Sequence, residues 1–270
     1  MIDESDNVGW IYSMNIQITP QKRCTFLLFT FLLFNMQTLE ADICPNNIVN
    51  YMGKKEAMLN TIQNQFREIL GRNINEKVLK ALRNVSRHEF VRCSDLQRAY
   101  GDHPLPIGAG QTISQPFIVA LMTDLLDVQK NHKILEIGTG SGYQAAVLGH
   151  LATHVHTIEI IEQLGNAARN RLQRLGLQNI SVYVQDGYHG LRDQAPFDSI
   201  IVTAAATHLP APLLEQLKVG GKIIIPVGPP YQTQVLKLIK KNGPKPKDYS
   251  ITNILTVRFV PFTRSSEQRP

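Results

Sequence analysis

The sequence is poor in cysteine, with three residues among 270 and no Cys-x-x-Cys pair. A disulfide-stapled scaffold, a zinc ribbon and a thioredoxin-like redox site are therefore not expected. A long apolar run is also missing, because the most apolar segment, residues 24–34, is about half as long as a membrane-spanning helix. We expect no permanent membrane anchor. No Gly-x-Ser-x-Gly sequence occurs, so a serine-hydrolase nucleophile is not expected either.

The chain is rich in apolar residues, with 43% of its residues hydrophobic and 19% charged. This composition excludes intrinsic disorder and collagen, and 270 residues are enough for one large domain. The net charge of +6 comes from segment 237–270, where eight Lys and Arg residues oppose Asp248 and Glu267. Charge confined to one segment is typical of a solvated tail, so we predict no nucleic-acid partner.

The N-terminus has the layout of a secretory signal. A basic pair at 22–23 precedes the apolar segment 24–34, and Ala41 offers a cleavage position. We expect a leader over residues 1–41, and its start, at Met1 or Met14, stays open. We expect a cytoplasmic location, and export through this segment is the alternative.

The sequence contains two groups of potential ligand residues, cysteines and histidines. Removal of the leader leaves Cys44 and Cys93, which can form one disulfide. His154 and His156 share one face of a β-type segment, near His150, but the further ligands that zinc requires are missing. No metal site is predicted.

Apolar periodicity predicts an α/β chain in which strands and helices alternate from residue 133 onward. This alternation predicts parallel βαβ units, with a central sheet and helices on both faces. Segment 100–116 is dense in Gly and Pro and is predicted to be an ordered loop without regular structure. Predicted helices are two within 54–82, then 117–126, 144–152, 162–175 and 209–217; predicted strands are 133–137, 155–160, 181–185, 199–203 and 222–227, with antiparallel edge strands at 234–239 and 253–261.

A glycine-rich turn follows the first of these parallel strands. Glu136 lies near the end of the apolar strand, just before the turn, and Gly138, Gly140 and Gly142 follow at alternate positions before Tyr143 opens a helix. Glycines at this spacing let the backbone approach a ligand closely. A dinucleotide fingerprint would place its third glycine at Tyr143, and an acidic residue before the turn suits an amine-bearing ligand better than a pyrophosphate.

Two further acids end the next two strands. Glu159 lies about twenty residues beyond the glycine turn, where a carboxylate accepts the hydroxyls of a ribose. Asp186 and Gly187 follow the third strand, where a carboxylate can accept from an adenine amino group. The carboxyl ends of parallel strands meet at one edge of the sheet, so we expect these residues to share a site.

Together these residues resemble the class I S-adenosylmethionine-dependent methyltransferases. Two nucleic-acid subclasses do not fit. Residues 203–206 are Thr-Ala-Ala-Ala where adenine methyltransferases carry Asn/Asp-Pro-Pro-aromatic, and both cysteines beyond the leader lie upstream of the glycine turn, unlike the Pro-Cys nucleophile of cytosine C5 enzymes.

Further motifs resemble the protein-L-isoaspartate O-methyltransferases over roughly residues 58–262. They are Leu-Pro-Ile-Gly at 105–108, Gly-Gln-Thr-Ile-Ser-Gln-Pro at 110–116, Pro-Phe-Asp at 196–198, residues 200–205, Gly-Gly at 220–221, Pro-Val-Gly at 226–228 and Val-Arg-Phe-Val-Pro at 257–261. The resemblance implies a three-layer, Rossmann-like fold. It also implies transfer of the methyl group of S-adenosylmethionine to the α-carboxylate of L-isoaspartyl residues in damaged proteins and peptides, with those proteins as partners.

The resemblance also implies roles for individual residues. Ser114 would hold the acceptor carboxylate near the methyl group, although a Ser at this place can instead cap the helix that begins near Pro116. The other implied positions are Gln111, Thr112 and Ile113 beside the methionine part of the cofactor; Glu136, Gly138, Gly140, Gly142, Glu159, Asp186 and Gly187 around the rest of it; and Ile107, Val227 and Gly228 facing the peptide.

The expected organisation is a leader (1–41), N-terminal helices with the substrate and cofactor loop packed on the core (42–130), a methyltransferase core (131–262) and a tail (263–270), in a monomer. Two rival hypotheses stay open. One is a methyltransferase for another acceptor, and the other is an exported, non-catalytic protein that retains the fold.

Overall fold

The structure, a computed structural model, describes residues 50–245 and 247–264, all within the unit that begins at Ile48. The predicted leader 1–41 and Cys44 lie outside the described residues. Within the described ranges, every helix is too short or too polar to span a bilayer.

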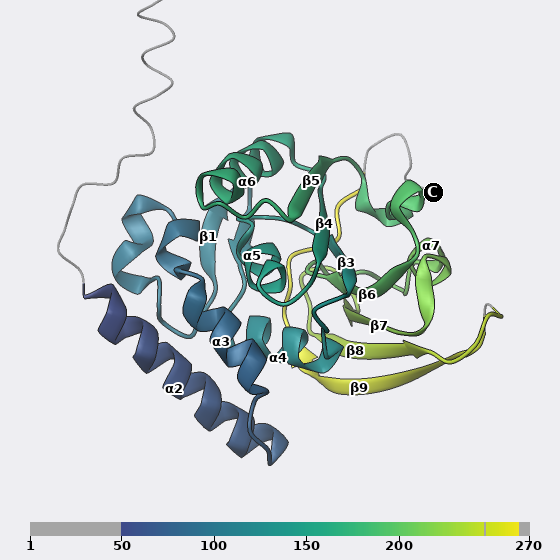
Figure 1. The fold of residues 1–270 in the computed structure, drawn as a ribbon, viewed down its shortest axis with the longest axis horizontal. Coiled ribbons are helices and arrows are strands. Elements are labelled where there is room, and N and C mark those ends of the chain that lie inside the picture. Colours follow the sequence, from purple (N-terminus) through teal and green to yellow (C-terminus); the bar gives the residue numbers. More distant parts are fainter. Residues whose placement is uncertain (1–49, 246, 265–270) are drawn as a thin grey trace, which may run out of the picture. The chain divides into compact units, whose positions relative to one another are not determined.

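The centre of the fold is a seven-stranded sheet with the strand order β5-β4-β3-β6-β7-β8-β9 (Figure 1). The strands from β5 to β7 pair in parallel, whereas β7, β8 and β9 pair antiparallel. The predicted mostly parallel sheet with antiparallel edge strands is therefore confirmed. The strands are β3 (Lys133–Ile137), β4 (His154–Glu159), β5 (Ile180–Val184), β6 (Phe197–Val202), β7 (Leu217–Val227), β8 (Gln234–Lys241) and β9 (Tyr249–Val257).

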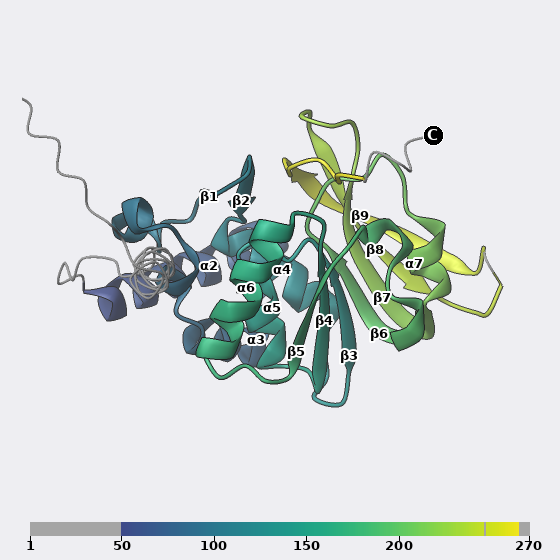
Figure 2. The ribbon, with the colours of Figure 1, turned by 90° about the horizontal axis from the view of Figure 1, so that it is seen from above.

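Alternate residues of the central strands enter two hydrophobic cores, one on each face of the sheet. Ile134 and Ile201 join the core that includes α4 and α5, whereas Leu135 and Ile200 join the core that includes α7. The period of two along a strand explains this division. Figure 2 shows α4, α5 and α6 on one side of the sheet and α7 on the other. The helices are α2 (Tyr51–Leu70), α3 (Glu76–Asn84), α4 (Pro116–Leu126), α5 (Tyr143–Gly149), α6 (Glu162–Arg174) and α7 (Ala211–Glu215).

The two predicted N-terminal helices are confirmed as α2 and α3. Each begins at an asparagine whose side chain accepts a backbone N–H, Asn50 for α2 and Asn75 for α3. Gly71 ends α2 in the left-handed conformation, where a glycine is least strained. The buried face of α2 packs on α4, with the rings of Phe66 and Phe117 in edge contact at 5.7 Å.

Segment 100–116 differs from its prediction, because it contains a short antiparallel hairpin made of β1 (Leu105–Gly108) and β2 (Gln111–Ile113). The glycines of this segment form the turn of the hairpin and not an irregular loop, since Gly108, Ala109 and Gly110 all have positive φ angles. The helix predicted over 209–217 is shorter than expected, because Leu217 already pairs with Phe197 in the sheet. Four short 3-10 helices complete the described chain, at Arg87–Phe90, Cys93–Arg98, Gly187–His189 and Arg192–Gln194.

Candidate active site

The glycine turn between β3 and α5 has the conformation that its sequence predicts. Gly138, Gly140 and Gly142 have φ angles of 96°, 52° and 87°, in the region that favours glycine. A Cβ atom on Gly138 would lie only 2.4 Å from the hydroxyl oxygen of Thr203 at the end of β6. Since that hydroxyl donates to the carbonyl of Gly138 at 2.6 Å, a larger residue would break the contact between the ends of β3 and β6.

Glu159 lies at the end of β4 and reaches across to the glycine turn. Its Oε2 accepts the backbone N–H of Gly140 at 2.8 Å, and its Oε1 accepts that of Ile161 at 2.9 Å. The residue is almost fully buried but lines a cavity at this edge of the sheet. The carboxylate is therefore held in place at the cavity wall.

Glu136, the acid before the glycine turn, is fully buried and lies outside the cavity wall. The hydroxyl of Thr157 lies 2.5 Å from its Oε2 and 2.7 Å from the hydroxyl of Thr139, so a hydrogen-bonded chain runs back to the turn. Burial, together with the nearby charge of Glu159, raises the pKa of Glu136 to about 8. At neutral pH this side chain is therefore mostly protonated and supports the turn from behind.

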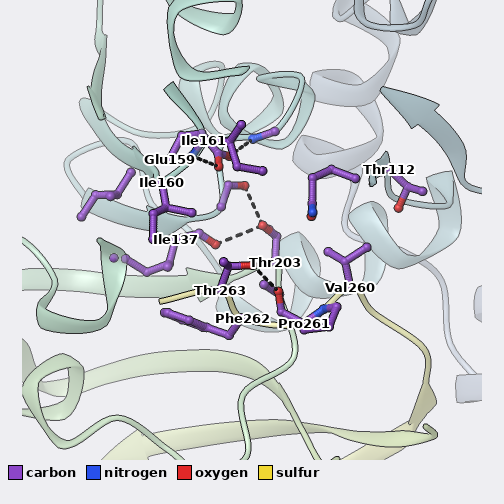
Figure 3. A pocket seen from close by; sticks show the side chains of 16 residues that line it. Thr112, Ile137, Glu159, Ile160, Ile161, Thr203, Val260, Pro261, Phe262 and Thr263 are labelled. Carbon is purple, nitrogen blue, oxygen red and sulfur yellow. Dashed lines mark hydrogen bonds between the residues drawn. The ribbon is translucent and has the colours of Figure 1, made fainter. Parts of the chain in front are cut away.

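The first cavity lies where the carboxyl ends of β3, β4 and β6 meet, and we call it the cofactor cavity. Figure 3 shows Glu159 on one side of it and residues 260–263, which we call the C-terminal strap, on the opposite side. Its volume is about 60 Å³. The lining residues are Gln111, Thr112, Ile137, Gly138, Gly140, Ile158, Glu159, Ile160, Ile161, Gly187, Thr203, Ala204, Val260, Pro261, Phe262 and Thr263.

The donors and acceptors on this wall fit an adenosine-bearing cofactor. Gly138 and Gly140 offer backbone that a ligand can approach closely, because neither has a side chain on the wall. Glu159 adds a carboxylate that can accept hydrogen bonds from hydroxyl groups, and Ile158 and Ile160 add apolar surface. No group of three or more acidic, histidine or cysteine side chains in the described part of the chain is placed to hold a metal ion.

Asp186 lies beside this cavity rather than on its wall, whereas its neighbour Gly187 is on the wall. One carboxylate oxygen accepts the N–H of Tyr188, and the other accepts Nε of Arg264, both at 2.9 Å. The guanidinium of Arg264 also lies 3.7 Å from the ring centre of Tyr188. The carboxylate thus links the end of β5 to the C-terminal segment.

A second cavity, of about 430 Å³, adjoins the first, and we call it the acceptor cavity. Thr112, Thr203 and Val260 line both cavities, so the two meet at these residues. Ser114 lines the acceptor cavity, and its hydroxyl has no hydrogen-bond partner among the described residues. The other residues of its wall are Pro104, Gln115, Ile118, Thr233, Thr256, Val257, Arg258 and Phe259.

The remaining predicted positions lie around these cavities. Ile113 is buried in the core, and Gly142 is the N-cap residue that precedes α5. Ile107 lies over the glycine turn, since its Cδ1 is 3.2 Å from the position that a Cβ on Gly140 would take. Val227 ends β7 and forms a bridge with Ala206, and the following Gly228 donates its N–H to the carbonyl of Ala206; neither residue lies on a cavity wall.

Sequence reasoning assigned no role to Thr203 or to the C-terminal strap. Thr203 follows a parallel strand, which is the signal that identified Glu159, so the same argument could have found it. The strap has no such signal. It reaches the cofactor cavity because Ala205 donates its N–H to Val260 and accepts the N–H of Phe262.

Comparisons with known proteins agree with this geometry. The family model described as protein-L-isoaspartate(D-aspartate) O-methyltransferase matches residues 54–267. Protein-L-isoaspartate O-methyltransferase 2 of Polaromonas sp. is 57% identical over 190 residues, which cover 70% of this chain and 89% of that protein. Protein-L-isoaspartate O-methyltransferase 1 of Nitrosospira multiformis is 53% identical over 206 residues, with coverages of 74% and 86%.

Solved structures give the same result. A protein-L-isoaspartate O-methyltransferase superposes with a TM-score of 0.67 at 27% identity, covering 77% of this chain and 65% of that one. A Plasmodium falciparum beta-aspartate methyltransferase in complex with S-adenosyl-L-homocysteine superposes with a TM-score of 0.67 at 25% identity, covering 78% and 99%.

Proposed function

The chain belongs to the protein-L-isoaspartate (D-aspartate) O-methyltransferase family, and from this membership we propose how its two cavities share the reaction. It is an S-adenosylmethionine-dependent carboxyl methyltransferase that acts on L-isoaspartyl residues of damaged proteins. The roles of individual residues below are our proposals.

The cofactor cavity binds S-adenosylmethionine, which supplies a methyl group on a positively charged sulfur. Glu159 accepts hydrogen bonds from the ribose hydroxyls, and Asp186 with Gly187 receives the adenine. Gln111, Thr112 and Ile113 hold the methionine part, and the turn from Gly138 to Gly142 lies against the cofactor, supported by Glu136. Several backbone N–H groups and carboxylates that are already fixed in position support this assignment.

The acceptor cavity binds the isoaspartyl residue, with Ser114 donating a hydrogen bond to its α-carboxylate. When bound in the neighbouring cavity, S-adenosylmethionine would supply its methyl group to a carboxylate oxygen of the acceptor, and the electron pair of the broken carbon–sulfur bond would stay on sulfur. The attacking group is already ionised at neutral pH, so no general base is needed. The protein accelerates the step by aligning the two reactants and excluding water.

The observation that carries this proposal is the contact between the two cavities at Thr112, Thr203 and Val260. A donor held beside Glu159 and an acceptor held beside Ser114 would meet across these residues. Ile107, Val227 and Gly228 are proposed to contact the peptide on either side of the isoaspartyl residue.

The test is transfer of labelled methyl from S-adenosylmethionine to two matched peptides, one with L-isoaspartate and one with L-aspartate. The chain from Asp42 onward and the full chain should both place base-labile methyl on the isoaspartyl peptide alone. Cofactor binding without transfer would instead favour a methyltransferase for another acceptor. Absence of cofactor binding would favour the non-catalytic alternative.

We propose that the enzyme acts as a monomer. We also propose a cytoplasmic location, because S-adenosylmethionine is made in the cytosol. Cys93 is disulfide-bonded in the structure, which favours the alternative of export into an oxidising compartment. Cell fractionation, with sedimentation analysis of the purified protein and a thiol count before and after reduction, separates these possibilities.

A further inference from the structure

Arg258 is the one charged residue among those that line the acceptor cavity. The rest of that wall is neutral, with hydroxyl groups from Thr112, Ser114 and three further threonines. Arg258 is solvent-exposed and forms no ion pair or hydrogen bond within the described residues. Its five N–H donors are therefore available to a ligand in the same cavity as Ser114.

The backbone on either side of Arg258 is fixed. Val257 pairs with Gln234 in the register of β8 and β9, and Phe259 donates its N–H to Oε1 of the same glutamine at 2.8 Å. Gln234 is fully buried, and its amide nitrogen donates to the carbonyl of Pro229. The guanidinium of Arg258 thus extends from a rigid support, which favours selective recognition.

We propose that Arg258 is a specificity-determining residue that binds a second carboxylate of the substrate, from an Asp or Glu next to the isoaspartyl residue. This inference rests on the proposed function of the acceptor cavity. The α-carboxylate itself is the poorer partner, because a bidentate guanidinium contact would occupy the oxygen that attacks the methyl carbon. An Asp or Glu next to the isoaspartyl residue can form an ion pair with Arg258 without occupying the attacking oxygen.

Arg258 serves the peptide rather than the cofactor. It lines the acceptor cavity and is absent from the wall of the cofactor cavity. Replacement of Arg258 therefore changes the affinity for the peptide and leaves the affinity for the cofactor as it was.

The experiment compares isoaspartyl peptides that differ only in the residue beside the isoaspartate, which is Glu, Gln or Lys. Their dissociation constants are measured by fluorescence polarisation in the presence of S-adenosylhomocysteine, and kcat and KM are measured for the same peptides. The unmodified protein should bind the Glu peptide about fivefold more tightly than the Lys peptide, as a partly exposed ion pair allows. The difference should appear in KM and not in kcat.

The variants Arg258→Gln and Arg258→Lys test the side chain. Arg258→Gln should bring the three peptides to equal affinity, whereas Arg258→Lys should keep part of the preference because it keeps the charge. Lys240→Ala is the matched control. It removes one exposed positive charge from the far end of the same strand pair, where Lys240 faces Ser250, and it should leave the preference intact.

Three results would overturn the inference. An equal loss of affinity for all three peptides in Arg258→Gln would assign Arg258 to the acceptor carboxylate. A changed affinity of Arg258→Gln for S-adenosylhomocysteine, or a preference for the Glu peptide that Lys240→Ala abolishes to the same extent, would also contradict it. Binding is measured apart from turnover. A protein that shows the charge preference without methyl transfer would contradict the proposed function and not the role of Arg258.

Discussion

Glu159 and Gly140 are joined by a hydrogen bond of 2.8 Å, in which the glycine N–H donates to the carboxylate. The second carboxylate oxygen accepts from Ile161 after the end of β4, so one side chain connects the turns that follow two neighbouring strands. The carboxylate that is proposed to bind the ribose therefore also shapes the glycine turn. Replacing it should affect both functions.

Glu159→Gln should weaken cofactor binding by about tenfold or more, because hydrogen bonds to a charged group are worth about 1.5–3 kcal/mol. Its amide nitrogen would also face a backbone N–H of Gly140 or Ile161, which should lower the melting temperature. Titration calorimetry with S-adenosylhomocysteine measures the affinity. Glu162→Gln, an exposed change at the start of α6, is the control. An unchanged affinity in Glu159→Gln would contradict the ribose role.

Ser114→Ala should lower kcat by about tenfold and leave cofactor affinity and stability unchanged. The stability should not change because Ser114 does not cap α4. This helix begins without a side-chain cap, and the N–H of Phe117 in its first turn donates to Asp102. Methyl-transfer assays with the isoaspartyl peptide measure kcat, and thermal melts measure the stability.

Thr233→Val removes another hydroxyl from the same cavity and serves as the control for Ser114→Ala. It should change kcat much less. A lower melting temperature with normal turnover per folded Ser114→Ala molecule would instead identify Ser114 as a structural cap.

Much of the sheet could be predicted from the sequence because its strands have strong local signals. β3 has the predicted bounds, 133–137, since its apolar run ends at the glycine turn. Glu159 was found by its spacing from that turn, and both lie on the cofactor cavity. A local sequence pattern predicts an element correctly when the residues next to it in the sequence are enough to determine its structure.

The remaining features depend on contacts between distant parts of the chain. The β1–β2 hairpin escaped prediction because its strands are too short for an alternating pattern to appear. The C-terminal strap lines the cofactor cavity through its pairing with Ala205, which no local pattern encodes. The same holds for the ion pair of Asp186 with Arg264, since these residues are far apart in the sequence.

Glu136→Gln should remove a pH dependence of stability. Burial raises the pKa of Glu136 from an ordinary 4.5 to about 8, so the folded protein keeps a proton that the unfolded chain releases. The stabilisation by this protonated group is complete below about pH 4.5, where the unfolded chain is also protonated. It decreases as the pH rises from 4.5 to about 8 and is lost above about pH 8. The slope approaches about 1.4 kcal/mol per pH unit.

Glutamine carries no charge at any pH, so the stability of Glu136→Gln relative to the unmodified protein should increase between about pH 5 and pH 8. Urea unfolding across that range measures the difference, in which the titration of all other groups cancels. Glu68→Gln, an exposed change on α2, should give a constant difference. A constant difference for Glu136→Gln as well would show that its pKa is ordinary.

Asp102→Asn should lower both stability and turnover, because this carboxylate joins three elements around Ser114. It accepts hydrogen bonds from Gln65 on α2 at 2.8 Å, from Gln115 at 2.7 Å and from the N–H of Phe117 at 2.9 Å. An asparagine must turn its amide nitrogen toward one of these donors. We expect a loss of about 1–3 kcal/mol in the free energy of unfolding, measured with urea.

The loss of turnover in Asp102→Asn should appear in kcat at temperatures where the protein is fully folded, since Gln115 directly follows Ser114 and becomes free to move. Gln65→Ala is the matched control, because it removes one of the three donors and leaves the two nearest Ser114 in place. It should cost less stability and leave kcat nearly unchanged. If both variants lose stability while kcat per folded molecule stays constant, the network holds α2 on α4 without positioning the serine.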